Sequence, residues 1–135
     1  MNKLFAIILI IFSSINTTKS DLTIIIENIS NNNGQLIVGI YNSEASFLKK
    51  PLIRKKVRIV NNRVELIIKD VEYGEYAISI VHDENNNNKI DFHFYGPPSE
   101  KTAASNNAKS SFGPPKWEDA KFLINKDVTS VNIKM

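Results

Sequence analysis

Apolar and polar side chains alternate along most of this chain, and the period of two residues predicts strands. Residues 76–83 give the clearest case. The bulky Tyr76, Ile78 and Ile80 fall on one face of this stretch, and small residues fall on the other. Such a strand is expected between two layers of structure, at the centre of the fold.

Other stretches rich in β-branched residues predict six more strands, and clusters of Asn and Gly separate several of them. We expect hairpins where two such stretches flank a short polar turn, and a long irregular segment at residues 92–120. The predicted fold class is all-β, a seven-stranded antiparallel two-sheet sandwich of immunoglobulin-like or transthyretin-like form, with this long loop before the last hairpin. The expected hairpins pair 21–29 with 36–41, 56–60 with 63–69, and 121–124 with 129–134.

The first twenty residues have the pattern of a signal peptide. Lys3 precedes an apolar run at residues 4–12, and Thr18 and Ser20 place small side chains at the minus-three and minus-one positions of a cleavage site. That run is under half of the ~20 residues needed to cross a bilayer core. We therefore expect cleavage of residues 1–20, a domain at 21–135, secretion or a periplasmic location, and no stable membrane span afterwards.

Charge and cysteine content exclude several classes of function. The whole chain has a net charge of +3, and without Lys3 and Lys19 it has 15 basic and 14 acidic residues, close to neutral. A nucleic-acid partner is therefore not expected. With no cysteine, the chain has no disulfide framework, thiolate nucleophile or cysteine-ligated metal.

Oxygen-bearing side chains alternate immediately after the central strand and predict a calcium loop. Asp83, Asn85 and Asn87 match positions one, three and five of an EF-hand-like loop, Lys89 offers its backbone carbonyl at position seven, and Asp91 occupies position nine. The candidate metal ligands are these five residues. The expected cofactor is weakly bound calcium.

Two departures from the calcium pattern limit its strength. Position six is Asn88 where such loops have Gly, although Asn also adopts the left-handed conformation. Position twelve is Phe94, which has no carboxylate. With two charged ligands, we expect a Kd of roughly 10⁻⁴ to 10⁻³ M. The alternative is an asparagine-rich loop held only by bonds between side chains and backbone.

A hydrolytic site is the competing hypothesis at this end of the strand. It requires His82 and Asp83 to reach one open pocket, whereas strand alternation sends them to opposite faces. A metal site joining His82 to His93, the other histidine, meets the same obstacle. We expect a buried, hydrogen-bonded His82 and no catalytic residue.

Aromatic residues in the irregular segment allow two interpretations. They line a shallow groove for a glycan or a peptide, with Asn106, Asn107 and Lys109 as polar contacts, or they cover one sheet. We expect the covering role. The aromatic residues are Phe92, Phe94, Tyr95, Phe112 and Trp117.

Four motifs occur in an order that resembles a known family. They are Gly-Gln-Leu at 34–36, His-Asp-Glu-Asn at 82–85, Ser-Asn-Asn-Ala at 105–108 and Phe-Gly-Pro-Pro at 112–115. Over residues 22–135 the chain is similar to the bacterial family called domain of unknown function 2141. The resemblance implies a secreted sandwich of transthyretin-like or carboxypeptidase-regulatory-like type and brings no catalytic residue. We therefore expect an exported, non-enzymatic binding or structural module with an unidentified protein or glycan ligand.

Overall fold

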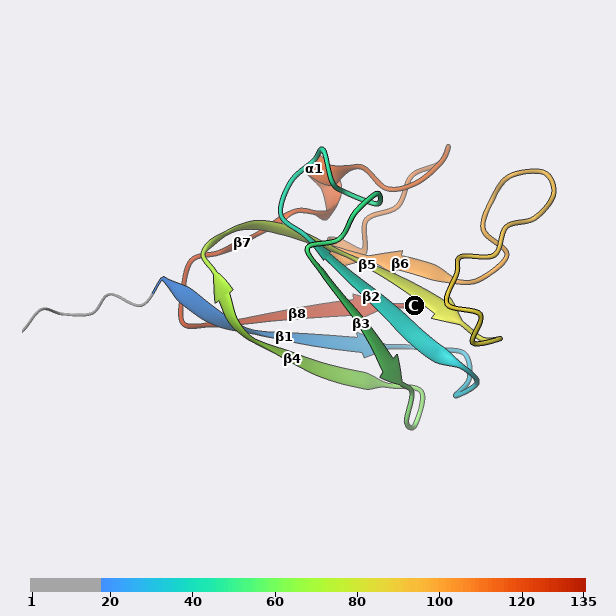
Figure 1. The fold of residues 1–135 in the computed structure, drawn as a ribbon, viewed down its shortest axis with the longest axis horizontal. Coiled ribbons are helices and arrows are strands. Elements are labelled where there is room, and N and C mark those ends of the chain that lie inside the picture. The colour runs from blue at the N-terminus through green and yellow to red at the C-terminus, as the bar shows by residue number, and fades with distance from the viewer. Residues whose placement is uncertain (1–17) are drawn as a thin grey trace, which may run out of the picture.

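The computed structural model describes residues 18–135, which form two β-sheets and very little helix (Figure 1). Eight strands account for most of the regular structure, with one turn of 3-10 helix and one of α-helix. The elements are β1 (Lys19–Glu27), β2 (Gln35–Tyr41), β3 (Ile53–Arg58), β4 (Val64–Glu72), β5 (Gly74–Asp83), β6 (Thr102–Ala104), η1 (Ser105–Asn107), α1 (Trp117–Ala120), β7 (Phe122–Ile124) and β8 (Val128–Lys134).

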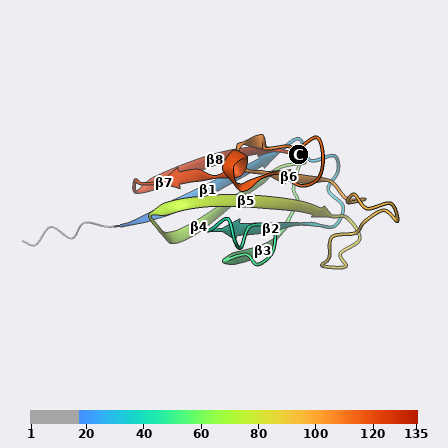
Figure 2. The same ribbon diagram turned by 90° about the horizontal axis from the view of Figure 1, so that it is seen from above.

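The strands pack as a two-layer sandwich. Sheet A has the order β4-β1-β8, and sheet B has the order β3-β2-β5, with β6 and β7 both pairing with β5. The two layers are visible when the molecule is viewed from above (Figure 2). The predicted all-β sandwich is confirmed. Within residues 18–135, no helix is long and apolar enough to cross a membrane.

The core lies between the two inner faces and consists mainly of β-branched and leucine side chains. Ile78 and Ile80 of β5 are fully buried in it, on the face predicted to carry the bulky residues. Leu22, Ile24 and Ile26 of β1 face them from sheet A and are also fully buried. Removal of this apolar surface from water is the main source of stability here.

The three predicted hairpins are wrong, because each turn carries the chain from one sheet to the other. β1 and β2 lie in different sheets, as do β3 and β4, and β7 and β8. Ile29 and Ile59, just after β1 and β3, are 2% and 3% exposed. Their side chains fill the space between the layers where the chain crosses, so a short polar turn did not signify a hairpin.

Two other details of the prediction also differ. Seven strands were expected, and the eighth, β6, lies inside the segment expected to be irregular. All pairings are antiparallel except that of β1 with β8, which is parallel. β1 begins at Lys19, so the predicted start of the mature chain at residue 21 falls within this strand. Residues 1–17 of the predicted signal peptide lie outside the described residues.

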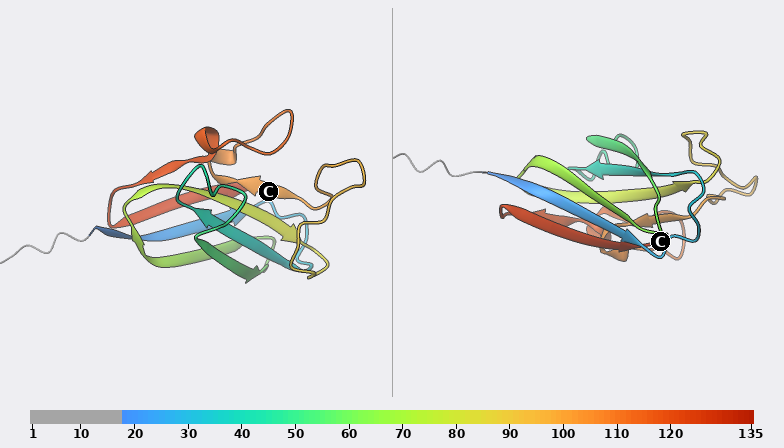
Figure 3. Two further views of the ribbon diagram at one scale, coloured as in Figure 1. Left: turned by 45° about the horizontal axis from the view of Figure 1, so that its top comes forward. Right: turned by 90° about the horizontal axis from the view of Figure 1, so that it is seen from below.

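An aromatic cluster covers one half of the outer face of sheet B. Tyr41 and Phe47 meet edge to face with ring centroids 5.4 Å apart, and Phe47 and Trp117 do so at 5.8 Å. We call this cluster the aromatic cap; α1, which supplies Trp117, is near the top of the left view in Figure 3. Its buried members are Tyr41, Phe47, Ala77, Ala104, Trp117 and Ala120.

Candidate functional site

The candidate calcium loop, residues 83–91, leaves the C-terminal end of β5 at the end of the sandwich opposite the turn between β7 and β8 (Figure 1). We call it the asparagine loop. Its first residue, Asp83, is still part of β5 and is fully buried. The loop therefore starts from a rigid point, which is the condition for holding side-chain oxygens in a fixed arrangement.

The buried Asp83 carboxylate is satisfied by three N–H groups. Oδ2 accepts hydrogen bonds from Gln35 Nε2 and from the backbone N–H of Asn88, both at 2.9 Å, and Oδ1 accepts one from the backbone N–H of Asn87 at 3.2 Å. Burial raises the pKa of Asp83, but these hydrogen bonds outweigh it, and the pKa lies below its ordinary value. The carboxylate is therefore charged and fixed at neutral pH.

Asp91 is held from the same loop by two side-chain amides. Asn85 Nδ2 donates to one carboxylate oxygen at 2.8 Å, and Asn87 Nδ2 donates to the other at 2.6 Å. These bonds are the main cause of a lowered pKa at Asp91. The side-chain oxygens of the two amides accept backbone N–H bonds at Asn87 and Lys89, so the loop closes on itself. The structure thus brings the predicted residues together by hydrogen bonds.

The backbone at Asn88 has the conformation that position six of a calcium loop requires. Its φ is +63°, in the left-handed region that Asn tolerates. Arg54 Nη2 on β3 donates to its carbonyl oxygen at 3.0 Å, and Gln35 Nε2 donates to its side-chain oxygen at 2.9 Å. The curvature of the loop is therefore fixed from two neighbouring strands.

Glu100 is a third acid at the site, and the sequence interpretation missed it. Its Oε2 accepts the backbone N–H of Asp91 at 3.2 Å, and its Oε1 is buried without a hydrogen-bond partner. Burial and the nearby Asp91 carboxylate raise the pKa of Glu100. No spacing rule points to a residue nine positions beyond Asp91, since the intervening segment first leaves the loop and then returns.

The turn between β1 and β2 packs against the start of the asparagine loop at Asp83 and Glu84. Gly34 allows this close approach because it has no side chain. Gly34 has φ of +67°, and a Cβ there would lie 2.6 Å from Glu84 Cα and still closer to the carbonyl oxygen of Asp83. Neither Gly34 nor Gln35 was predicted as a site residue. Their position in the Gly-Gln-Leu motif was the available signal.

The loop has fewer charged ligands than a strong metal site, which usually has at least three carboxylate, imidazole or thiolate side chains. Among residues 18–135, no three carboxylate, imidazole or thiolate side chains are arranged to hold a metal ion. Two carboxylates, amide oxygens and one backbone carbonyl make up the candidate set. Such a set suits a hard cation with flexible coordination more than a transition metal.

Comparison with protein families gives one result. A model described as uncharacterized protein conserved in bacteria, domain of unknown function 2141, matches residues 24–132. The chain belongs to this family. The match covers both sheets, the asparagine loop and the aromatic cap, and its description assigns no activity. No curated protein and no solved structure gives a significant match.

His82 in this family member is fully buried, as expected, and does not share an open pocket with Asp83. Its Nε2 donates to the carbonyl oxygen of Asn33 at 2.8 Å, and its Nδ1 lies 3.7 Å from a carboxylate oxygen of Glu84. His93 is elsewhere, stacked on Tyr95 with ring centroids 4.8 Å apart. The two histidines therefore do not form the metal site considered above.

The expected covering role of the aromatic residues holds for Trp117 alone. Trp117 is 7% exposed, but Phe92 is 60% exposed, Phe94 101%, Tyr95 65% and Phe112 95%. Ala77, Ala104 and Ala120 let the cap pack closely over sheet B, so the remaining rings are not needed there. The prediction that they cover a sheet is wrong for these four.

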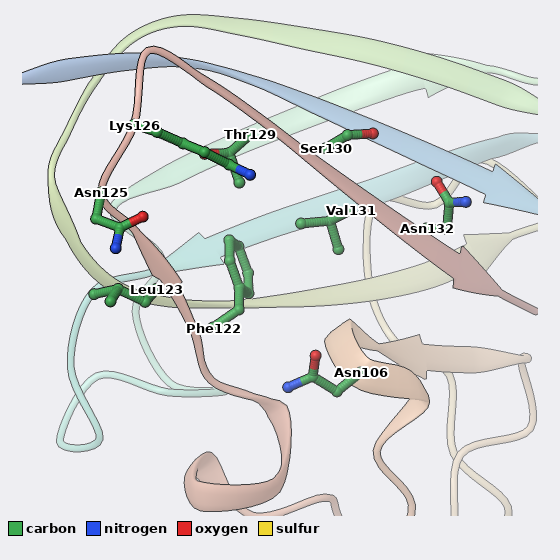
Figure 4. A pocket seen from close by; sticks show the side chains of 9 residues that line it. All are labelled: Asn106, Phe122, Leu123, Asn125, Lys126, Thr129, Ser130, Val131 and Asn132. Carbon is green, nitrogen blue, oxygen red and sulfur yellow. The ribbon is translucent and has the colours of Figure 1, made fainter.

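A shallow cleft lies away from the asparagine loop, between the edges of β7 and β8 (Figure 4). Its volume is about 390 Å³, and Phe122, Leu123 and Val131 form its apolar part. Asn106, at its rim, donates from Nδ2 to the carbonyl oxygen of Lys121 at 2.7 Å. This hydrogen bond gives Asn106 a structural role. The aromatic groove was the alternative to the covering role; of its proposed residues only Asn106 lines this cleft.

Proposed function

We propose that this protein is an exported, non-enzymatic β-sandwich module whose asparagine loop binds calcium weakly. The proposed ligands are Asp83, Asn85, Asn87 and Asp91 through side-chain oxygens and Lys89 through its backbone carbonyl. Export rests on the signal-peptide pattern of residues 1–20.

The observation that carries the calcium proposal is the closed ring of hydrogen bonds from Asp83 to Asp91. Two carboxylates of lowered pKa lie at its two ends, and Asn85 and Asn87 lie between them. A loop in which both acids are ionised and alternate residues point inward has the charge and shape that a hard divalent cation requires.

The same ring makes the binding weak. The amide nitrogens of Asn85 and Asn87 point at Asp91, so both amides must rotate before their oxygens face a cation. Calcium then replaces two hydrogen bonds in addition to water. Together with only two charged ligands, this places the expected Kd at roughly 10⁻⁴ to 10⁻³ M.

The test is thermal unfolding of the mature chain with and without calcium. At about 5 mM calcium and a Kd near 0.5 mM, mass action adds about 1.4 kcal/mol of stability, which raises Tm by roughly 4 to 8 °C. Magnesium at equal concentration is expected to give a smaller rise, because it requires stricter octahedral geometry. Calorimetric titration measures the same equilibrium directly.

Asp91→Asn is the variant that separates binding from folding. It removes one charged ligand from the exposed side of the loop, and we expect it to abolish the calcium-dependent rise in Tm. Asp119→Asn on α1 makes the same charge change at an exposed site outside the loop and is expected to leave the rise intact. An unchanged Tm and no heat of binding in the unmodified protein would contradict the proposal.

The alternative role for the loop is purely structural, and the contact with Arg54 and Gln35 favours it. Both side chains tie Asn88 to sheet B without any ion. If calcium has no effect and Asp83→Asn destabilises the apo protein strongly, the loop is a brace for the end of β5.

A further inference from the structure

Residues 92–99 form a narrow projection beyond the asparagine loop, which we call the aromatic finger. Phe92 pairs with Pro98, and the backbone N–H of His93 donates to the carbonyl oxygen of Pro97 at 2.9 Å. Ser99 N–H closes the base by donating to the carbonyl oxygen of Asp91 at 2.8 Å. The finger extends past the strand ends (Figure 1).

The finger presents its aromatic rings to solvent as a connected group. Phe94 and Tyr95 meet edge to face at 5.2 Å between centroids, and His93 stacks on Tyr95 at 4.8 Å. Phe94 is fully exposed at 101%. Exposed apolar groups of this kind on a projecting loop mark a site of contact with another surface.

The charge distribution around the finger identifies the kind of surface. Residues 92–99 contain no Asp, Glu, Lys or Arg. Three cations, Arg54, Lys56 and Arg58, alternate along β3 on its outer face and are exposed, while Val57 packs against the core between them. Arg54 also donates to the carbonyl oxygen of Asn88 at 3.0 Å, so one end of this basic stripe contacts the asparagine loop, from which the finger projects. The acids Asp91 and Glu100 meet at the base of the finger, where Glu100 accepts the backbone N–H of Asp91.

We propose that the aromatic finger and the basic stripe dock the protein peripherally on an anionic phospholipid bilayer. Aromatic rings are favoured at the boundary between headgroups and acyl chains, and an uncharged tip enters that boundary without desolvating a charge. Lysine and arginine of β3, which contacts the adjoining asparagine loop, are attracted to anionic headgroups. A neutral glycan or an apolar protein pocket would not be attracted to the positive charge of the basic stripe. Charge complementarity therefore favours an anionic lipid surface.

Sedimentation with vesicles tests the docking. We expect binding to vesicles of phosphatidylcholine with phosphatidylglycerol, weak binding to phosphatidylcholine alone, and loss of binding as salt is raised. Phe94→Ala should weaken the partition coefficient roughly tenfold, because the ring no longer leaves water. Lys56→Gln with Arg58→Gln should weaken it by about fivefold per charge.

Matched controls are available at the opposite end of the sandwich. Leu123→Ala removes an exposed apolar side chain on β7, and Lys126→Gln removes a cation from the turn that follows; neither should alter binding. All of these variants change exposed side chains and should keep the unfolding temperature of the parent. Equal loss of binding in the control variants would overturn the proposal.

A tryptophan at the tip reports insertion directly. In Phe94→Trp, fluorescence should shift to shorter wavelength on anionic vesicles and be quenched by brominated lipid, while the buried Trp117 gives a constant background. Failure of the vesicles to bind either protein, or binding to an added soluble glycan or protein in their place, would refute lipid docking. Vesicle binding is measured once with chelator and once with calcium. A failure of lipid docking can therefore be distinguished from a failure of calcium binding.

Discussion

The two halves of the outer face of β5 are covered in different ways. Over Ala77, the aromatic cap buries rings against small side chains, with Trp117 as its largest member. Over Asp83, the asparagine loop buries a charge, and the bonds are N–H groups to carboxylate oxygens. One strand thus carries an apolar cover at one end and a polar cover at the other.

The difference shows which part of the molecule responds to solution conditions. Burial of aromatic area does not involve a titrating group, whereas a buried carboxylate depends on its charge and on every donor that surrounds it. Changes in pH and in cation concentration should therefore act at the loop and leave the cap unaffected. The following experiments test this contrast, from the largest expected effect to the smallest.

Gly34→Ala is expected to be the most destabilising change, by about 4 kcal/mol or more. The new methyl group would overlap the main chain at Asp83 and Glu84 and would require a positive φ as well. Gly113→Ala is the control, because Gly113 also has a positive φ but a methyl group added there would meet no atom within 4 Å. Urea unfolding gives the loss of unfolding free energy in each variant, and the difference between the two losses is the cost of the steric overlap at Gly34. Equal losses in the two variants would show that the turn does not support the loop.

Trp117→Ala should cost about 3 to 4 kcal/mol at the other half of β5, through lost burial and the cavity left in the aromatic cap. This loss should be the same at pH 4 and pH 7, because the cap contains no group that titrates in that interval. Denaturant unfolding at the two pH values measures it. A strong pH dependence of the loss would contradict the contrast between the two covers.

Asp83→Asn should cost about 1 to 3 kcal/mol at pH 7, since its amide N–H₂ would face N–H donors. The folded pKa of Asp83 is lowered, so its ionisation stabilises the protein above the unfolded pKa of about 3.9, and this contribution is lost as pH falls through the folded value. The stability gap between wild type and variant should therefore narrow below about pH 4. Unfolding curves from pH 7 to pH 3 provide the measurement.

Glu100→Gln should have the smallest effect and the opposite sign, a rise in Tm of about 2 °C at pH 7. The raised pKa of Glu100 means that its contribution is present below the unfolded pKa of about 4.3 and is lost as pH rises through the folded value. The gain should disappear near pH 4. Glu44→Gln, an acid in the turn after β2, is the control; a gain of equal size there would indicate a general charge effect.

Alternation within single strands was enough to predict much of this fold. It gave the all-β class, the central position of residues 76–83 and the burial of His82. It did not give the pairing of strands, because a polar turn at Asn61 and Asn62 is compatible with both a hairpin and a crossing between sheets. The chain crosses between the sheets at this turn, and Ile59 is buried between the two layers. That burial depends on the opposite sheet, which the local pattern does not reveal.

The candidate site was predictable only where its residues are close in sequence. Asp83, Asn85, Asn87 and Asp91 come together as expected from their spacing. The partners that fix them are Gln35, Arg54 and Glu100, which come from other elements. The Gly-Gln-Leu motif was a signal for Gln35 alone, and no local pattern indicates Arg54 or Glu100. Exposure of Phe94 was missed for a related reason: the alanines beneath Trp117 already complete the aromatic cap.

The parallel pairing of β1 with β8 joins the earliest described strand to the latest one. Sheet A has the order β4-β1-β8, so β1 lacks one of its two neighbouring strands until residues 128–134 pair with it. Leu22, Ile24 and Ile26 of β1 are incompletely covered before that. Until residues 128–134 are in place, the polypeptide therefore lacks a complete hydrophobic interior. Removal of residues 128–134 should abolish cooperative folding altogether, even though every other described strand is retained.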